Sequence, residues 1–275
     1  MFPLPLALWL SVFLPTGKPP EVTASYAADL ALGARWIELR FLDGSTLVAM
    51  ETEVTRAHWQ AVMGTSPRSP CEQQDCPIED VTPFSMMAFA NRLSEIEGLD
   101  PCYELPACWD HAPDKDFGCE APGQRPECTG YRAPTWREWA TLLDADPTTE
   151  PRDEVDLGSI ESINSPARRA WLERRGWFAG NSNLEPHPVA QKLPNTWGFF
   201  DLLGNVEELV TEAQRHPFGF RPPNPIGVDP TRLGAAGCRY YSSPLICSDI
   251  RSGGAAVLDM GGPGLGLRLV RSISP

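Results

Sequence analysis

The sequence reads PNTWGFFDLLGNVEELV from Pro194 to Val210, and this stretch decides the fold. Glycine, proline and asparagine interrupt its apolar residues every few positions, a spacing that is typical of turns and short strands. The whole chain beyond Gly180 has the same glycine-rich and aromatic character. We therefore predict that the C-terminal third consists of loops and small strands.

Upstream of this stretch, the sequence predicts one hairpin and four helices. Alternating apolar residues on either side of Asp43-Gly44 predict a β-hairpin within residues 35–50. Threonine or Ser-Pro start signals, followed by apolar residues at helical spacing, predict the helices. These cover residues 55–64, 82–98, 135–143 and 165–176. Helices and strands do not alternate regularly, which argues against a parallel doubly wound sheet.

The composition indicates a single α+β domain with low regular secondary structure. The chain has 275 residues, of which 42% are hydrophobic, and this is enough for one large domain. Its 29 prolines and 23 glycines favour a loop-rich fold with short elements. Because no repeat, linker or low-complexity tract divides the chain, we assign residues 25–275 to one domain.

The N-terminus predicts export. The chain is apolar through Leu14, and about thirteen apolar residues are fewer than the roughly twenty that span a bilayer. This length suits the core of a signal peptide, although the usual basic start is missing. Val22, Thr23 and Ala24 offer small residues for cleavage, so we predict that residues 1–24 are a signal peptide. No other long apolar run predicts a membrane span, and we expect a secreted or periplasmic protein.

The charge of the chain limits its partners. The formal net charge is −13 at pH 7. A field of this sign repels phosphate backbones and anionic lipid surfaces, which argues against nucleic-acid binding and a membrane-surface role. The partner is expected to be a protein or a glycan, and the sequence does not identify it.

Eight cysteines indicate disulfides, which agrees with export. No two cysteines have the C-x2-C spacing that is typical of structural zinc sites. The sequence alone leaves three connectivities open for the four central cysteines. The pairs that we favour are Cys71–Cys76, Cys102–Cys128, Cys108–Cys119 and Cys238–Cys247.

Five segments follow one another in an informative order. They read ETEVTRAHWQAVMG (51–64), PIEDVT (77–82), YRAPTWREW (131–139), HPVAQKLPNTWGFFDLLGNV (187–206) and GLRLVR (266–271). In this order they resemble the formylglycine-generating enzyme (sulfatase-modifying factor) family, from about residue 45 to residue 272. The resemblance implies a compact domain with a C-type-lectin-like core.

Active members of that family use copper, held by two cysteines in a C-x4-C arrangement, to oxidise a cysteine of a client sulfatase to formylglycine. The resemblance places Cys247, followed by Arg251, at the second of these cysteines. Five residues earlier the chain has Ser242, and a hydroxyl is a poor ligand for Cu(I). We therefore expect that copper does not bind. A disulfide between Cys238 and Cys247 is the structural alternative to a catalytic Cys247.

The resemblance also implies a structural calcium ion. The predicted ligands are the side chains of Asp201, Asn205 and Glu208 together with the Val206 carbonyl. Calcium takes roughly six to eight oxygen ligands, and a turn of this kind can present several of them. The alternative is that Asn205 caps a short helix and that Glu208 and its neighbour Glu207 face water.

Two functions follow from these residues. The one that we favour is an exported, non-catalytic binding or scaffold protein, because Ser242 leaves the catalytic cysteine pair incomplete. Other motif positions have changed as well, since Glu207 and Leu209 stand where the family has tryptophans. The alternative is a copper-dependent oxidoreductase that acts on a cysteine of a client protein.

Overall fold

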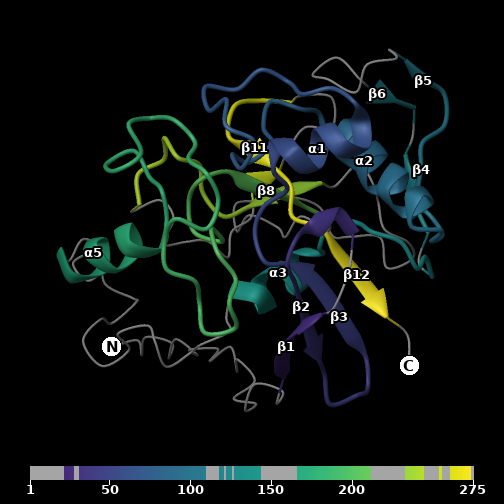
Figure 1. Cartoon of the computed structure of the whole chain (residues 1–275), viewed down its shortest axis with the longest axis horizontal. Coiled ribbons are helices and arrows are strands. Elements are labelled where there is room, and N and C mark those ends of the chain that lie inside the picture. Colours follow the sequence, from purple (N-terminus) through teal and green to yellow (C-terminus); the bar gives the residue numbers. More distant parts are fainter. Residues whose placement is uncertain are drawn as a thin grey trace, which may run out of the picture.

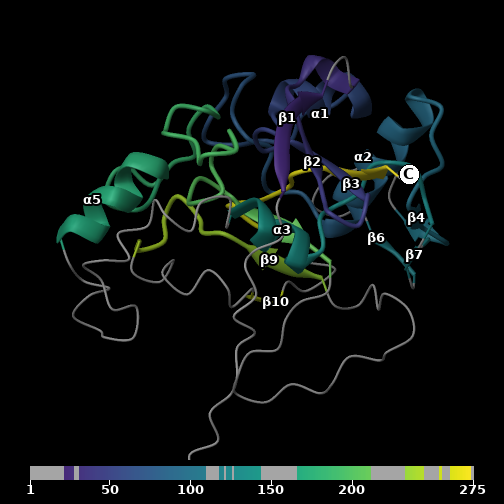
Figure 2. The same cartoon turned by 90° about the horizontal axis from the view of Figure 1, so that it is seen from below.

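The computed structural model describes residues 22–27, 31–109, 118–120, 122–125, 127–143, 166–211, 233–244, 254–255 and 261–273. Figures 1 and 2 show two small sheets with helices around them and long connecting loops. None of the helices in these ranges is long and apolar enough to cross a membrane. Both helices and strands are present and the regular elements are short, as the α+β prediction requires.

The first sheet contains the predicted hairpin. Its strands are β1 (Thr23–Ala27), β2 (Trp36–Arg40), β3 (Thr46–Met50) and β12 (Val270–Ile273), hydrogen-bonded in that order. All three pairings are antiparallel. In β2 the alternating Ile37 and Leu39 are fully buried, and Gly44 has the positive φ of 85° that the tight turn requires. β1 includes Thr23 and Ala24, so the sheet begins two residues before residue 25, the predicted start of the domain.

The second sheet is built from the glycine-rich C-terminal third. Its strands are β8 (Glu207–Val210), β9 (Gly234–Ala236), β10 (Gly254–Ala255) and β11 (Leu265–Gly266). The order is β10-β9-β8-β11, in which β11 is parallel to β8. β8 follows the turn at Gly204–Asn205 and forms the last four residues of the segment 194–210. The sheet therefore holds the C-terminal end of that segment in place.

The four predicted helices are confirmed. They are α1 (Arg56–Met63), α2 (Pro83–Ile96), α3 (Trp136–Leu143) and α5 (Pro166–Arg175), and a short 3-10 turn, η1, covers Ala31–Gly33. A capping box starts α3, because Glu138 N donates to Thr135 Oγ1 and Thr135 N donates to Glu138 Oε2. Trp59 of α1 stacks on Phe89 of α2 with ring centroids 5.0 Å apart, which joins the two helices in the core.

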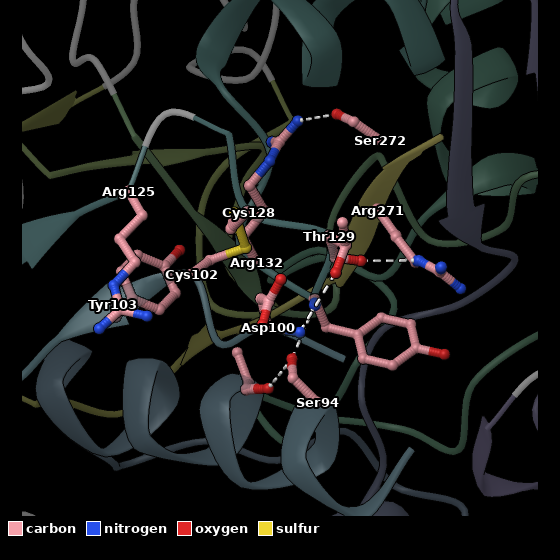
Figure 3. The surroundings of a disulfide bond; sticks show 12 residues. Ser94, Asp100, Cys102, Tyr103, Arg125, Cys128, Thr129, Arg132, Arg271 and Ser272 are labelled. Carbon is pink, nitrogen blue, oxygen red and sulfur yellow. Dashed lines mark hydrogen bonds between the residues drawn. A yellow bond between two sulfur atoms is a disulfide. The ribbon is translucent and has the colours of Figure 1, made fainter. Parts of the chain in front are cut away.

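A disulfide-linked arm follows α2, and Figure 3 shows the disulfide Cys102–Cys128 within it. It consists of two strand pairs, β4 (Tyr103–Glu104) with β7 (Gly123–Gln124) and β5 (Cys108–Trp109) with β6 (Gly118–Cys119). The central cysteines form the nested pairs Cys102–Cys128 and Cys108–Cys119, and a third disulfide joins Cys71 to Cys76. Ser94 ties the arm to α2, because its Oγ accepts from Tyr131 N and donates to Ala90 O.

The N-terminal cap of α1 depends on a neutral histidine. Thr55 N donates to His58 Nδ1 over 3.1 Å, and His58 N donates to Thr55 Oγ1 over 3.3 Å, so His58 occupies the place of the glutamate in a capping box. A protonated imidazole has no acceptor nitrogen. Burial of the ring lowers the pKa of His58 to about 4.

We therefore predict that His58 makes the domain sensitive to acid. The unfolded chain, with an ordinary histidine pKa of about 6.5, binds this proton before the folded chain does, so stability falls as the pH decreases from about 6.5 towards 4. At pH 5 the loss from this residue is about 2 kcal/mol. The His58→Gln variant keeps a capping acceptor and should lose less stability than the wild type between pH 7 and pH 5 in urea titrations. An equal loss in both proteins would refute the prediction.

Candidate functional site

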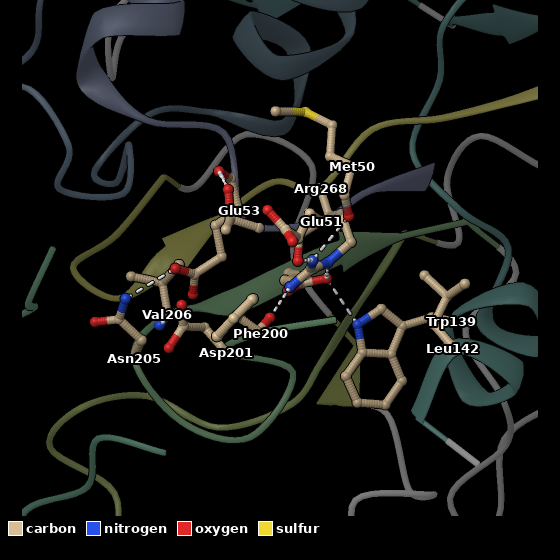
Figure 4. Close-up of polar contacts among 12 residues, drawn as sticks. Met50, Glu51, Glu53, Trp139, Leu142, Phe200, Asp201, Asn205, Val206 and Arg268 are labelled. Carbon is tan, nitrogen blue, oxygen red and sulfur yellow. Dashed lines mark hydrogen bonds and ion pairs between the residues drawn. The ribbon is translucent and has the colours of Figure 1, made fainter. Parts of the chain in front are cut away.

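Arg268 lies at the centre of a buried polar cluster beneath the loops (Figure 4). Its guanidinium is fully buried, and all five N–H donors have acceptors. The Nε and one Nη2 donor contact Glu208 at 2.7 to 3.0 Å. The other donors reach the carbonyls of Met50, Glu51 and Phe200 at 2.7 to 2.9 Å. One side chain thus joins the end of β3, the loop before β8, and β8 itself.

Both carboxylate oxygens of Glu208 already accept hydrogen bonds. Besides its three contacts with Arg268, its Oε2 accepts from Trp139 Nε1 of α3 over 2.8 Å. Trp139 and Glu208 are each 1% exposed. The carboxyl group therefore faces a guanidinium in a dry environment, where a charge without a partner is costly.

Asn205 joins four segments of chain at one point. Its Nδ2 donates to Glu53 Oε2 (2.8 Å) and to His187 O (3.1 Å), and its Oδ1 accepts from His187 N (3.0 Å). On the backbone, Asn205 N donates to Trp177 O and Asn205 O accepts from Tyr240 N. Its φ is 58°, in the left-handed region that asparagine tolerates better than most residues. Asn205 therefore holds the loops of the site in place and is not a helix cap.

Glu53 is a buried carboxyl group close to other negative charges. It is fully buried, and its Oε1 accepts from Val206 N over 3.0 Å. Burial, followed by the charges of Asp201 and Glu208, raises the pKa of Glu53 well above its usual value. The site thus disfavours a negative charge on Glu53, and Glu208 is the direct partner of Arg268.

One carboxyl oxygen of Asp201 accepts a hydrogen bond and the other has no partner. Its Oδ2 accepts from Ala190 N over 2.7 Å, whereas Oδ1 is buried and has no hydrogen-bond partner. Burial raises the pKa of Asp201 to about 6. Asp201 and Asn205 both have a positive φ, so the backbone is unfavourable for most residue types at both ends of this turn.

The predicted calcium ligands are close in sequence, but the structure commits most of their oxygens elsewhere. Glu208 binds Arg268 and Trp139, and the Asn205 side chain binds Glu53 and His187. Among the described residues, no group of three His, Cys, Asp or Glu side chains is arranged to hold a metal ion. Asp201 Oδ1 has no hydrogen-bond partner, and together with the predicted Val206 carbonyl it makes two oxygens, far short of the roughly six that calcium needs. The arrangement does not fit the ion, and calcium stays a prediction from the sequence alone.

The loop at the position where the family holds copper is fixed by hydrogen bonds. Ser242 N donates to Arg239 O over 2.9 Å, and Ser242 O accepts from Ala179 N over 3.0 Å. Ser182 Oγ donates to Tyr240 O over 2.7 Å. Cys238 is disulfide-bonded, and Cys247 lies outside the described residues. With a hydroxyl at 242 and an oxidised sulfur at 238, the described residues offer no thiolate, so they do not fit copper.

Next to this loop, Trp177 lies between two basic side chains. The His187 ring stacks on the indole with centroids 3.8 Å apart, and Lys192 Nζ lies 3.8 Å from the same centroid. Because one position over a ring cannot hold both groups, they occupy its two faces. His187 is fixed further, since its Nε2 lies 2.8 Å from Ser182 O.

The sequence predicted Asp201, Asn205 and Glu208 as site residues but missed Glu53 and Arg268. Glu53 and Arg268 both stand inside the segments that resemble the family, at 51–64 and 266–271, yet neither was assigned a role. A signal was available for Arg268, because a cation flanked by Leu267 and Leu269 in a closing apolar strand requires a buried counter-ion. No comparable pattern identifies Glu53.

Comparison with known proteins agrees with this architecture. A family model for the sulfatase-modifying factor enzyme 1-like domain matches residues 23–273. The chain is also 28% identical over 180 residues to the chaperone protein LppX of Paenibacillus barcinonensis. That match covers 60% of this chain and 61% of LppX, so the chain spans less than two thirds of that relative.

Solved structures with the same fold include three with low sequence identity. Treponema denticola variable protein 1 has a TM-score of 0.60 at 23% identity, covering 92% of this chain and 99% of its own. CarF has a TM-score of 0.55 at 20% identity, with 83% and 87% covered. PvdO from Pseudomonas aeruginosa has a TM-score of 0.54 at 17% identity, with 92% of each covered. At these identities the likeness shows the fold alone, and it confirms the predicted α+β fold of the formylglycine-generating enzyme type. The chain belongs to the family of the sulfatase-modifying factor enzyme 1-like domain.

Proposed function

We propose that the chain is a non-catalytic binding or scaffold protein of this family. The observation that supports this most directly is the disulfide-bonded state of Cys238, together with Ser242 at the position of a copper ligand. A thiolate is the form of sulfur that binds Cu(I), and a disulfide sulfur does not supply it. The part of this loop that the structure describes, up to residue 244, offers no thiolate for copper.

The tight hydrogen bonding of the loops favours presentation of a fixed surface. Asn205, Ser182 and Ser242 connect segments that are distant in sequence, and Asn205 is fully buried. A surface that is ordered before binding loses less conformational entropy when a partner arrives. One similar protein is named a chaperone, which agrees with a role in binding rather than in oxidation.

We also propose that the protein is secreted or periplasmic. The three disulfides Cys71–Cys76, Cys102–Cys128 and Cys108–Cys119 are the supporting observation. Disulfides persist in oxidising compartments and are rare in the reducing cytosol. Fractionation of the producing cell, with the protein located by antibody, tests this proposal, and a cytosolic pool of reduced protein would contradict it.

The test of the binding role is the absence of turnover. The purified chain, incubated with Cu(I) and a sulfatase-derived peptide that contains the target cysteine, should leave the peptide unchanged in mass spectra. A member of the family with an intact cysteine pair serves as the positive control. Thiol titration of the denatured wild type should find no free thiol. Aldehyde formation that disappears in the Cys247→Ala variant would overturn the proposal.

A further inference from the structure

α5 is a basic helix on an acidic protein. The chain has 23 lysines and arginines against 36 acidic residues. The helix reads PARRAWLERR and contains four arginines against the single acid Glu173. In Figures 1 and 2, α5 lies at one side of the molecule, and α2 and the disulfide-linked arm lie at the other. Positive charge is thus concentrated on one peripheral element.

The packing of α5 leaves part of this charge in solvent. Leu172 is buried in a small apolar cluster with Phe178 and Leu203, and Arg168 on the same side is also buried. Arg169 and Arg174 are both exposed. At 3.6 residues per turn they lie about 140° apart around the helix axis, so the helix is anchored by one face and has an arginine on each flank of its exposed face.

These two arginines differ from most others in the described ranges. Seven arginines there form ion pairs with glutamate side chains. Arg169 and Arg174 form none with a described residue. Arg174 is favoured by the helix dipole because it lies in the last turn, but Arg169 lies in the first turn, where a positive charge is unfavourable. The stability of the helix does not explain Arg169.

Lys192 extends the positive charge beyond the end of the helix. Its Nζ donates to Glu173 O over 2.8 Å, and Leu193 N donates to Arg174 O over 3.0 Å. The loop before Pro194 is therefore fixed against the last turn of α5. We call the surface formed by Arg169, Arg174 and Lys192 the basic surface.

The aromatic rings beside the basic surface are already contacted by other side chains. Arg175 lies 4.4 Å from the ring centroid of Trp171, and Trp177 has His187 on one face and Lys192 on the other. A sugar ring that binds by stacking requires a free aromatic face, and Trp177 has none. Arginine, in contrast, pairs with carboxylates through two parallel N–H donors. Charge rather than stacking is the means of recognition here.

We propose that the basic surface binds an acidic segment of a partner protein, rich in glutamate or aspartate. The helix of ten residues is about 15 Å long, and an extended segment of eight residues spans about 26 Å, so one segment reaches from Arg169 past the helix end to Lys192. The inference rests on the proposed binding role. Its failure would leave that role to another surface, whereas turnover of the sulfatase peptide would overturn the role itself.

The test uses a fluorescent peptide of eight glutamates and the full chain. Fluorescence anisotropy at low ionic strength should show saturable binding that weakens as salt is added. The Arg169→Glu/Arg174→Glu variant should bind at least about tenfold more weakly, since two attractive contacts become repulsive. The matched control is Arg92→Glu/Arg125→Glu, which changes the net charge equally on the opposite side of the molecule and should have a much smaller effect.

Three results would overturn the proposal. The first is a wild-type chain that does not bind the peptide, or a control variant that weakens binding as much as the α5 variant while both remain folded. The second is tighter binding of heparin than of the peptide, which would indicate a polysaccharide. The third concerns residues 144–161 of the chain itself, which include seven acidic residues. If the peptide bound only after these acidic residues were changed to Asn and Gln, the basic surface would be a binding site for residues 144–161 and not for a partner protein.

Discussion

Replacing Arg268 with methionine is expected to lower the free energy of unfolding by about 3–5 kcal/mol, the range for a buried ion pair that loses one partner. Methionine fills part of the volume but supplies no donor. The variant leaves Glu208 buried without its cation, next to Glu53 and Asp201. It also leaves the Met50, Glu51 and Phe200 carbonyls without their donor. Urea titration monitored by tryptophan fluorescence measures the loss.

Two further variants at this position and one control at an exposed pair separate charge from geometry. Arg268→Lys keeps the charge but has three donors instead of five, so it should recover only part of the loss. Arg268→Met/Glu208→Leu removes both charges and should be more stable than the single Arg268→Met variant. Arg40→Met removes the cation of an exposed pair and should change stability by less than about 1 kcal/mol. A loss below about 1 kcal/mol for Arg268→Met would contradict the structure of the cluster.

The elements that the sequence predicted correctly are specified by short-range signals. The Asp43-Gly44 turn and the caps at Thr55, Thr82 and Thr135 each act within a few residues of the element that they limit. The strands of the disulfide-linked arm were not predicted. Each of them is two residues long, and alternation of apolar and polar residues has no meaning over two positions.

The candidate site could be predicted only in part, because its partners are distant in sequence. Asp201, Asn205 and Glu208 lie within eight positions, and the resemblance of this segment to the family implied that they bind calcium. The cation that the structure supplies is the guanidinium of Arg268, 60 residues beyond Glu208. Glu53 is 152 residues before Asn205. Only the pairing of β3, β8, β11 and β12 brings these residues together, and a local pattern does not encode it.

The residues with positive φ in this turn were also only partly predictable from the sequence. Gly204 and Asn205 were expected in a turn, and both have positive φ. Asp201 also has a φ of 57°, which the sequence does not reveal, because aspartate is common in every kind of loop. Its conformation is stabilised by the contact of Oδ2 with Ala190 N, a residue that has a positive φ as well.

The backbone contact that assembles the site explains why Gly176 is needed. The sequence marks Gly176 only as the end of a helix, but a Cβ built on it would lie 1.7 Å from Leu203 O. A Cβ on Gly204 would lie 2.3 Å from Trp177 O. The chain at 176–177 therefore touches the chain at 203–204 backbone to backbone. This contact allows Asn205 N to donate to Trp177 O and places Asn205 against Glu53.

We expect the Gly176→Ala variant to lose about 3 kcal/mol of stability, since the backbone carbonyl of Leu203 cannot move aside as the end of a flexible side chain can. Gly262→Ala is the matched control, because a Cβ there meets nothing within 4 Å and the backbone has no positive φ. It should change stability by less than about 0.5 kcal/mol. Melting temperatures and urea titrations of both variants measure the difference. If Gly176→Ala were as stable as Gly262→Ala, the two segments could not be in contact, and Asn205 would lack the support that orders the loops of the site.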